Sequence, residues 1–152
     1  MRRLVLACAV AACAAPATLR PAMLLEVENA SRGTAFRIAL PEGAAFSVVS
    51  QHSMYDQPVT EEFRLDGQHI VLESVSSPSA AVLEYFGITS AGRRHAVGRA
   101  MEQIVFRVAM GTPQRLVLRG QERSFLELGD RGDRLVMRPV RRPALADWFS
   151  GS

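Results

Sequence analysis

Short runs in which apolar and polar residues alternate recur along this chain, and each run ends in a cluster of turn-forming residues. A period of two places every second side chain on one face of a β-strand. Sequences such as PEGA, DGQ, GTP and GDRG separate the runs at intervals of roughly ten residues, which is typical of hairpin-rich domains. The expected strands are 22–29, 34–40, 45–53, 57–65, 69–76, 102–110, 114–120, 123–128 and 133–140.

These runs predict one all-β domain over residues 22–140, a small antiparallel sandwich or barrel of about eight to nine hairpin-connected strands. The segment 77–100 is ambiguous. Within it, AAVLEYFG (80–87) fits either a strand or a short helix, and ITSAGRRHAVGRA (88–100) is typical of a long mobile loop. The tail 141–152 is expected to be irregular, with its aromatic pair docked on the body of the domain.

The first 17 residues have the pattern of an export signal. Two arginines at positions 2–3 precede an apolar run over 4–15, followed by small residues. This run is shorter than the roughly 20 apolar residues that cross a bilayer as a helix. Two outcomes remain open. Cleavage after residue 15 or 17 would release a soluble protein, whereas residues 10–13 (Val-Ala-Ala-Cys) resemble a lipobox, which would make Cys13 a lipidated N-terminus. A periplasmic protein, soluble or lipid-anchored, is expected.

Export changes how the cysteines and the charge are interpreted. Cys8 and Cys13 both lie in the signal, so the remaining domain has no disulfide and depends on core packing. The full chain has a formal net charge of +3, but without Arg2 and Arg3 it carries 16 basic and 15 acidic residues. This balance excludes a nucleic-acid-binding protein. Membrane contact is expected only through the possible lipid anchor.

Residues 52–63, HSMYDQPVTEEF, hold the densest group of candidate functional side chains. In a strand over 57–65, Glu61 shares the core face with Val59 and Phe63, so a carboxylate stands where apolar side chains are expected. A buried carboxylate is costly unless it is paired.

The hairpin suggests partners for this carboxylate. If residues 53–57 form the loop, Ser50 and His52 come near Val59 and Glu61 across the ladder. A Glu61–His52 pair would raise the pKa of the histidine and lower that of the carboxylate, which would make the site mildly pH-sensitive.

The same stretch resembles the HS…PV-x-E-x-F signature of a bacterial family known as domain of unknown function 1850. The matching positions are His52, Ser53, Pro58, Val59, Glu61 and Phe63. The resemblance covers most of the mature chain and implies a small, exported or membrane-tethered, strand-rich protein. Relatives are often encoded beside TAXI-type TRAP transporters, which take up organic anions, so it implies TRAP transporter subunits as partners. YFGITS (85–90) departs from the glycine-rich phenylalanine segment that many relatives have after the next strand.

Neither nucleophilic nor metal chemistry is indicated. His52 and Ser53 are neighbours in a strand and point to opposite faces, which disfavours a Ser-His-Asp triad with Asp56. Glu61 and Glu62 face apart for the same reason, unlike the paired carboxylates of a glycosidase. The three histidines lack the spacing of a zinc site. No enzyme activity, metal or cofactor is expected.

Arg93, Arg94 and Arg99 are candidate anion contacts, because guanidinium groups form forked hydrogen bonds to carboxylates. The sequence therefore predicts an exported, non-enzymatic accessory protein that acts through binding, with the hairpin either as the contact surface or as the element that fixes its shape. The alternative is a periplasmic β protein that binds a small ligand or metal in a pocket lined by Glu61, His52 and the 93–99 loop.

Overall fold

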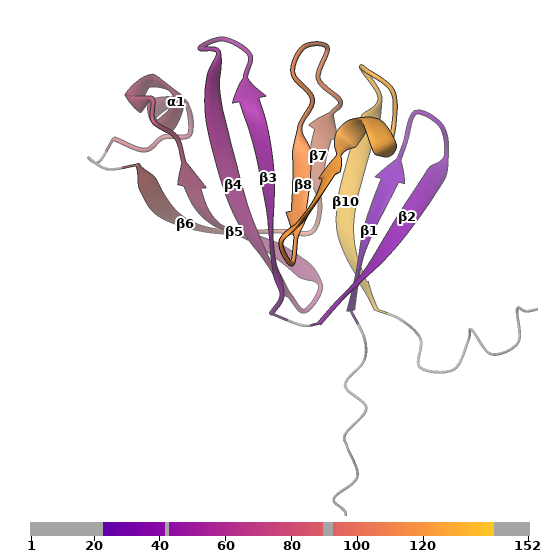
Figure 1. Ribbon diagram of the computed structural model, residues 1–152. Coiled ribbons are helices and arrows are strands. Elements are labelled where there is room, and N and C mark those ends of the chain that lie inside the picture. The colour runs from indigo at the N-terminus through magenta and orange to yellow at the C-terminus, as the bar shows by residue number, and fades with distance from the viewer. Residues whose placement is uncertain (1–22, 42, 90–92, 142–152) are drawn as a thin grey trace, which may run out of the picture.

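The computed structural model describes residues 23–41, 43–89 and 93–141, and over these residues the chain forms an all-β fold (Figure 1). The ten strands of the described residues are β1 (Met23–Asn29), β2 (Thr34–Leu40), β3 (Ala45–His52), β4 (Gln57–Asp66), β5 (His69–Ser76), β6 (Arg94–Met101), β7 (Ile104–Arg107), β8 (Arg115–Leu118), β9 (Gln121–Ser124) and β10 (Arg134–Arg141). The expected export signal 1–17 with Cys13, and residues 142–152 of the expected tail, lie outside the described residues.

The strands form two antiparallel sheets. One has the order β2-β1-β10-β7 and the other the order β6-β5-β4-β3-β8-β9. Each sheet keeps two edge strands, so the strands do not close into a barrel, and the fold is an open sandwich (Figure 1). The prediction of a hairpin-connected sandwich is confirmed, with ten strands in place of the expected eight to nine.

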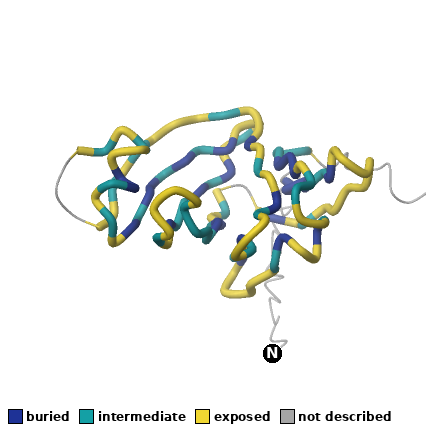
Figure 2. The backbone as a smooth tube through the Cα atoms, turned by 90° about the horizontal axis from the view of Figure 1, so that it is seen from above, coloured by how far each residue is buried: buried dark blue, intermediate teal, exposed yellow. Residues whose placement is uncertain are grey.

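A single apolar core lies on the inner faces of the sheets. Figure 2 shows the buried segments running along the strands, with exposed turns at their ends. Alternation explains the burial of Met23, Leu25 and Val27 in β1, all at most 3% exposed. The largest fully buried side chains include Phe63, Phe125, Leu65, Ile70, Leu116, Leu135 and Met137. Each contributes about 1.5–3 kcal/mol when it leaves water.

The expectation of a long loop over 88–100 is wrong for its second half, which forms the edge strand β6. Leu72 pairs with Arg99 and Ser74 with Ala96, so two residues of β6 stand opposite one residue of β5. Gly98 has a φ of 71°, which a residue without a side chain adopts readily. This bulge breaks the period-two alternation, and the strand is therefore hard to recognise in the sequence.

Two further elements differ from the expected strands. The expected strand 123–128 ends at Ser124, where a 3-10 turn η1 (Phe125–Glu127) begins. The Ser124 hydroxyl accepts from Leu126 N and the Glu127 carboxylate accepts from Ser124 N, a reciprocal cap that the S-x-x-E spacing could have signalled. The expected strand 102–110 is ordered as a strand only over 104–107.

The ambiguous segment 80–87 contains the short helix α1 (Ala80–Tyr85), which lies beside the β4–β6 end of its sheet (Figure 1). The side chain of Ser79 caps its first turn by accepting from Val82 N. Val82 and Leu83 are buried, so the helix covers part of the core.

A polar network joins the β1–β2 turn to the turn before β10. Asn29 is completely buried, and its Nδ2 donates to Leu128 O (3.2 Å) and to Asp133 Oδ2 (2.9 Å). Arg32 Nε also donates to Asp133 Oδ2 (2.7 Å). The Asn29 hydrogen bond, together with that from Asp130 N, lowers the pKa of the Asp133 carboxyl. A Cβ at Gly129 would lie 2.4 Å from Asn29 Nδ2, so glycine permits this close approach.

We expect Asn29→Ala to lower the free energy of unfolding by about 2–3 kcal/mol, because it removes the side-chain donor of the buried Leu128 carbonyl and one of the three donors to Asp133 Oδ2. Urea denaturation measures this change. Glu122→Ala is the control, since Glu122 forms an ion pair with Arg115 in which both side chains are about half exposed, and exposed pairs contribute little. Equal stability of the Asn29 variant and the control would contradict the structural role of this network.

Candidate functional site

The β3–β4 hairpin turn, residues 53–56, is held by local hydrogen bonds. Asp56 N donates to His52 O (2.8 Å), and Gln51 Nε2 donates to Asp56 Oδ1 (3.1 Å). Asp56 has a φ of 49°, a left-handed conformation that aspartate tolerates better than most residues. The hairpin therefore has a defined shape, and its loop is one residue shorter than the expected 53–57, because Gln57 already belongs to β4 and pairs with His52.

His52 lies in a small aromatic cluster between the hairpin and α1. Its ring centroid is 5.1 Å from that of Tyr55 and 4.8 Å from that of Tyr85, and Tyr85 also meets Phe86 edge-on. The Nδ1 atom of His52 is buried without a hydrogen-bond partner among the described residues. A buried polar atom without a partner is rare in folded proteins.

The expected approach of His52 to Glu61 is wrong. His52 pairs with Gln57, whereas Glu61 pairs with Val48, four residues back along β3. Four residues correspond to about 13 Å along a strand. No hydrogen bond or ion pair joins the two side chains, so they cannot form the predicted charge pair.

Glu61 instead stands among apolar side chains on the inner face of its sheet. Val48 and Val75 lie directly opposite it on the two neighbouring strands, and both are completely buried. The Glu61 carboxyl has no hydrogen-bond or ion-pair partner within the described part of the chain, and the residue is half-buried. Burial raises the pKa of this carboxyl from 4.5 to about 7, because the charged form loses water and gains no donor.

The other positions of the signature serve the fold. Val59 and Phe63 are core residues, 3% and 1% exposed, and Phe63 stacks on Phe46 with ring centroids 5.2 Å apart. The carbonyl of Pro58 accepts from Ser77 Oγ (2.8 Å), which ties β4 to the segment before α1. Ser53 is exposed in the turn. The signature therefore combines residues that pack in the core with Glu61, whose carboxyl has no partner among the described residues.

The three candidate anion contacts are not equivalent. The Arg94 guanidinium is bonded to the Glu62 carboxylate, Nε at 2.9 Å, and Ser74 Oγ donates to the same carboxylate. These bonds, that from Ser74 first, lower the pKa of Glu62. Arg93 and Arg99 are exposed at the edge strand and the turn before it. The charge of Arg94 is already neutralised, so these residues form no ready-made anion site.

A cleft of about 600 Å³ lies between the hairpin and the β7–β8 connection, which rise from the same end of the sheets (Figure 1). We call it the hairpin cleft. Gln51, Ser53 and Asp56 line it from the hairpin, and residues 107–112 with Gln114 line it from the other side.

The second wall of the hairpin cleft is held rigidly. Arg131 Nη1 donates to the carbonyls of Ala109 (3.0 Å), Met110 (2.6 Å) and Gly111. Gln114 accepts from Ala109 N (2.9 Å) and donates to Arg107 O (2.8 Å). The connection is therefore fixed before any ligand arrives, which reduces the entropy lost on binding.

Exposed apolar side chains occur in both segments that form the hairpin cleft. Met54 and Tyr55 lie in the hairpin turn between the lining residues Ser53 and Asp56 and are 71% and 40% exposed, and Met110, which lines the opposite wall, is 75% exposed. We call these three residues the apolar rim. Sequence reasoning missed it as a surface, although two large apolar residues in a turn are an unusual signal. Exposed apolar side chains that gather beside a cleft are typical of binding surfaces.

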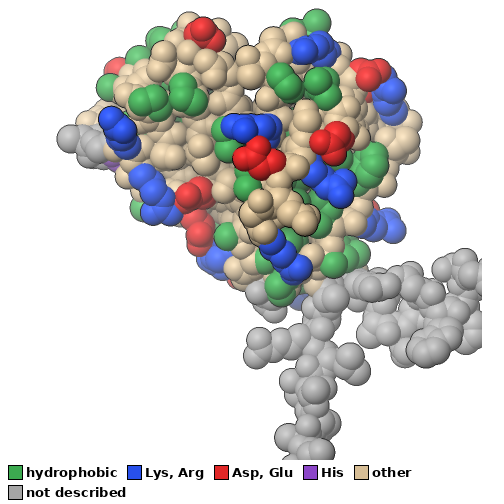
Figure 3. All heavy atoms as spheres, in the orientation of Figure 1, with side chains coloured by type: hydrophobic (Ala, Val, Ile, Leu, Met, Phe, Trp, Pro, Cys, Tyr) green, Lys and Arg blue, Asp and Glu red, His purple; other side chains and the backbone are tan. Residues whose placement is uncertain are grey.

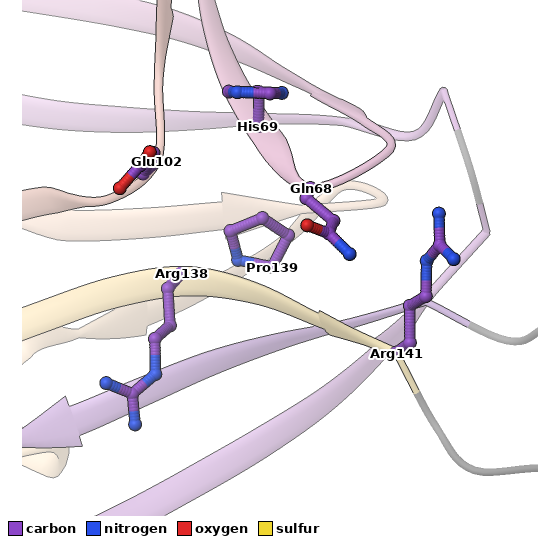
Figure 4. A pocket seen from close by; sticks show the side chains of 6 residues that line it. All are labelled: Gln68, His69, Glu102, Arg138, Pro139 and Arg141. Carbon is purple, nitrogen blue, oxygen red and sulfur yellow. The ribbon is translucent and has the colours of Figure 1, made fainter.

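A smaller cleft of about 380 Å³ lies at the other end of the molecule, between the β4–β5 turn and the end of β10 (Figure 4). Arg138 points away from Gln68 and His69 (Figure 4) and is bonded to Glu26. Arg141 and Glu102 line the same cleft with opposite charges. This mixture gives it no net preference for an anion or a cation.

The face of the molecule that Figure 3 shows has no dominant charge. Figure 3 shows basic and acidic side chains interspersed over the visible face. Within 23–41, 43–89 and 93–141, no three His, Cys, Asp or Glu side chains come together as a metal site would require. No helix among these residues has the length and apolar character to cross a membrane.

We expect Glu61→Gln to stabilise the protein at pH 8. The folded protein holds the Glu61 proton up to a pH of about 7, whereas the unfolded chain releases it near 4.5. The contribution of the Glu61 proton to stability is therefore fully present below pH 4.5, and it is lost as the pH rises through 7. The variant should gain about 1–3 kcal/mol in free energy of unfolding at pH 8 relative to the wild type, and little at pH 5.

Urea denaturation at the two pH values measures this difference. Glu62→Gln is the matched control. Its carboxyl has a lowered pKa, so its contribution is present at neutral pH and the variant should be less stable than the wild type there. A Glu61 variant that loses stability at pH 8, as the Glu62 variant does, would mean that Glu61 has a stabilising partner.

The comparisons with known proteins add no relative. No family model, no curated protein and no solved structure matches the chain. The resemblance to domain of unknown function 1850 therefore depends on the signature residues alone.

Proposed function

We propose that the protein is an exported, non-enzymatic accessory protein that binds a partner protein through the hairpin cleft and its apolar rim. The observation that carries this proposal is the position of the rim. Met110 lines the preformed cleft, and Met54 and Tyr55 are exposed in the hairpin turn, whose residues Ser53 and Asp56 line the other wall. Interfaces are enriched in methionine and aromatic residues, which supply large contact areas.

The groups that line the hairpin cleft support binding rather than catalysis. Ser53, Asp56 and Arg107 offer a hydroxyl, a carboxylate and a guanidinium, which can orient a polar segment of a partner. The nearest histidine, His52, is directed into the aromatic cluster with Tyr55 and Tyr85. A serine without an adjacent base is a weak nucleophile, so this arrangement favours recognition.

Export and the choice of partner follow from the sequence. The export signal expected over 1–17 and the lipobox at Cys13 support a periplasmic protein, free or lipid-anchored. The resemblance of residues 52–63 to domain of unknown function 1850 supports subunits of a TAXI-type TRAP transporter as the partner. The hairpin that carries the signature lines one wall of the hairpin cleft. This position supports the hairpin as the contact surface for the partner.

A small-ligand binder is the second candidate. The hairpin cleft, at about 600 Å³, lies in the size range of small-molecule sites, and its walls are held by hydrogen bonds. A ligand that binds only the folded state raises the melting temperature. The partner-protein proposal expects no such rise with small organic anions.

The test is crosslinking in the native cell with a C-terminally tagged chain, followed by mass spectrometry of the recovered proteins. We expect the double variant Met54→Glu/Met110→Glu to lose the partner, because charges would have to be buried at the contact. Leu126→Glu is the matched control, since Leu126 is 41% exposed on η1, outside the hairpin cleft.

Recovery of transporter subunits by the wild type and the control, but not by the double variant, would support the proposal together with its partner. Equal recovery by all three would contradict the hairpin cleft as the contact. If no protein is recovered while a small organic anion raises the melting temperature, the small-ligand candidate replaces it.

A further inference from the structure

We propose that Glu61 binds a cationic group, an alkylammonium or a guanidinium, on the inner face of the six-stranded sheet. This site lies apart from the hairpin cleft and does not depend on the proposed docking there. Its evidence is a carboxyl that is partly enclosed by apolar side chains, has no donor among the described residues and belongs to a residue that is only half-buried.

One row of paired residues across the sheet defines the site. Val48, Glu61, Val75 and His95 stand opposite one another on β3, β4, β5 and β6, so their side chains emerge on the same face. Val48 and Val75 are completely buried, and they flank the carboxyl with methyl groups. Val59 and Phe63, both core residues, flank it along its own strand. The Glu61 carboxyl thus emerges among apolar side chains that are themselves closed to solvent.

A second buried acid, Glu26, differs from Glu61 because it has arginine partners. Glu26 is only 4% exposed, yet it accepts from Arg37 Nε (2.7 Å) and from Arg138 Nε (3.0 Å). The Arg37 bond, reinforced by Arg138, lowers its pKa against the effect of burial. Glu61 has no such donors, and its pKa moves in the opposite direction. An acid that costs stability and holds no structure is a candidate for binding.

The chemistry of the carboxylate selects the ligand. An ionised carboxylate accepts hydrogen bonds and donates none, so its missing partner is a donor. A cationic donor gains more than a neutral one in surroundings of low polarity, because the charge-assisted bond is stronger there. An anion would be repelled by the ionised carboxylate.

The other titratable groups near this face are few among the described residues. His95 of β6 stands in the same row, and His52 of β3 lies four residues from Val48. On α1, Glu84 and Tyr85 are exposed. Glu62 and Glu73 are on the outer face, bonded to Arg94 and Arg64. Glu61 is thus the acid that an entering cation would meet on the inner face.

Cation binding is linked to the proton on Glu61. Only the ionised carboxyl binds the cation, and its pKa of about 7 in the free protein leaves it largely protonated at pH 6. The apparent affinity should therefore be about tenfold higher at pH 8 than at pH 6.

The experiment is a titration of the ¹⁵N-labelled protein with n-butylammonium and with ethylguanidinium, followed by amide chemical shifts at pH 6 and pH 8. Butanol and butyrate are the control probes. We expect saturable shifts at residues 48, 61 and 75 with the cations only, with the tenfold pH dependence. Glu61→Gln should abolish them, and Glu62→Gln, which removes the outward-facing neighbour, should leave them unchanged.

The spectrum of the Glu61 variant reports whether it is folded, and so separates loss of binding from loss of structure. No saturable shift with either cation, or equal shifts in the wild type and the Glu61 variant, would overturn the proposal. Crosslinked recovery of the partner by Glu61→Gln distinguishes the source of the cation. Undiminished recovery assigns the site to a free amine or guanidine, and reduced recovery to a lysine or arginine side chain of the partner. The cation titration does not involve the hairpin cleft, so its result would stand even if Met54→Glu/Met110→Glu still recovered the partner.

Discussion

Burial of apolar side chains between the two sheets is the constraint on which the rest of the structure depends. The described residues 23–41, 43–89 and 93–141 contain no cysteine, so no disulfide contributes there and packing must offset the loss of chain entropy. Within this core, Leu25, Phe63, Leu116 and Met137 are at most 1% exposed. A strand that contributes to such a core is expected to place an apolar side chain at every inward position. Against that background one inward acid, Glu61, stands out.

The structure separates the two tasks that the sequence concentrates in residues 52–63. Val59 and Phe63 belong to the core, and the hairpin turn ahead of them displays Met54 and Tyr55 beside a preformed cleft. The core holds the hairpin in place, and the hairpin offers a surface. Glu61 belongs to neither task, since it neither packs as an apolar residue nor reaches the cleft. Its isolation from His52 is a consequence of register, because Val48 occupies the position opposite it.

Most of the fold could be predicted from the alternation of apolar and polar residues along the strands. Eight of the expected runs contain a strand of the structure, and the ninth, 123–128, contributes only its first residues, because Ser124 and Glu127 cap a 3-10 turn. The edge strand β6 was missed because the bulge at Gly98 breaks the alternation. For the site, alternation correctly placed Glu61 inward, since side-chain direction follows from local periodicity. The residues opposite Glu61 could not be predicted, because they depend on the register between strands, which the loop length alone did not specify. The hairpin cleft could not be predicted either, because one of its walls comes from the distant segment 107–114.

The central claim is that Glu61 is an interior acid without a partner in the free protein. The carbon-13 shift of its side-chain carboxyl, followed from pH 4 to pH 9 with Glu62 as the internal reference, tests this claim most directly. We predict a midpoint near 7 for Glu61 and a midpoint below the ordinary value for Glu62. A Glu61 midpoint near or below 4.5 would show that the carboxyl is hydrated or paired, and would contradict the account.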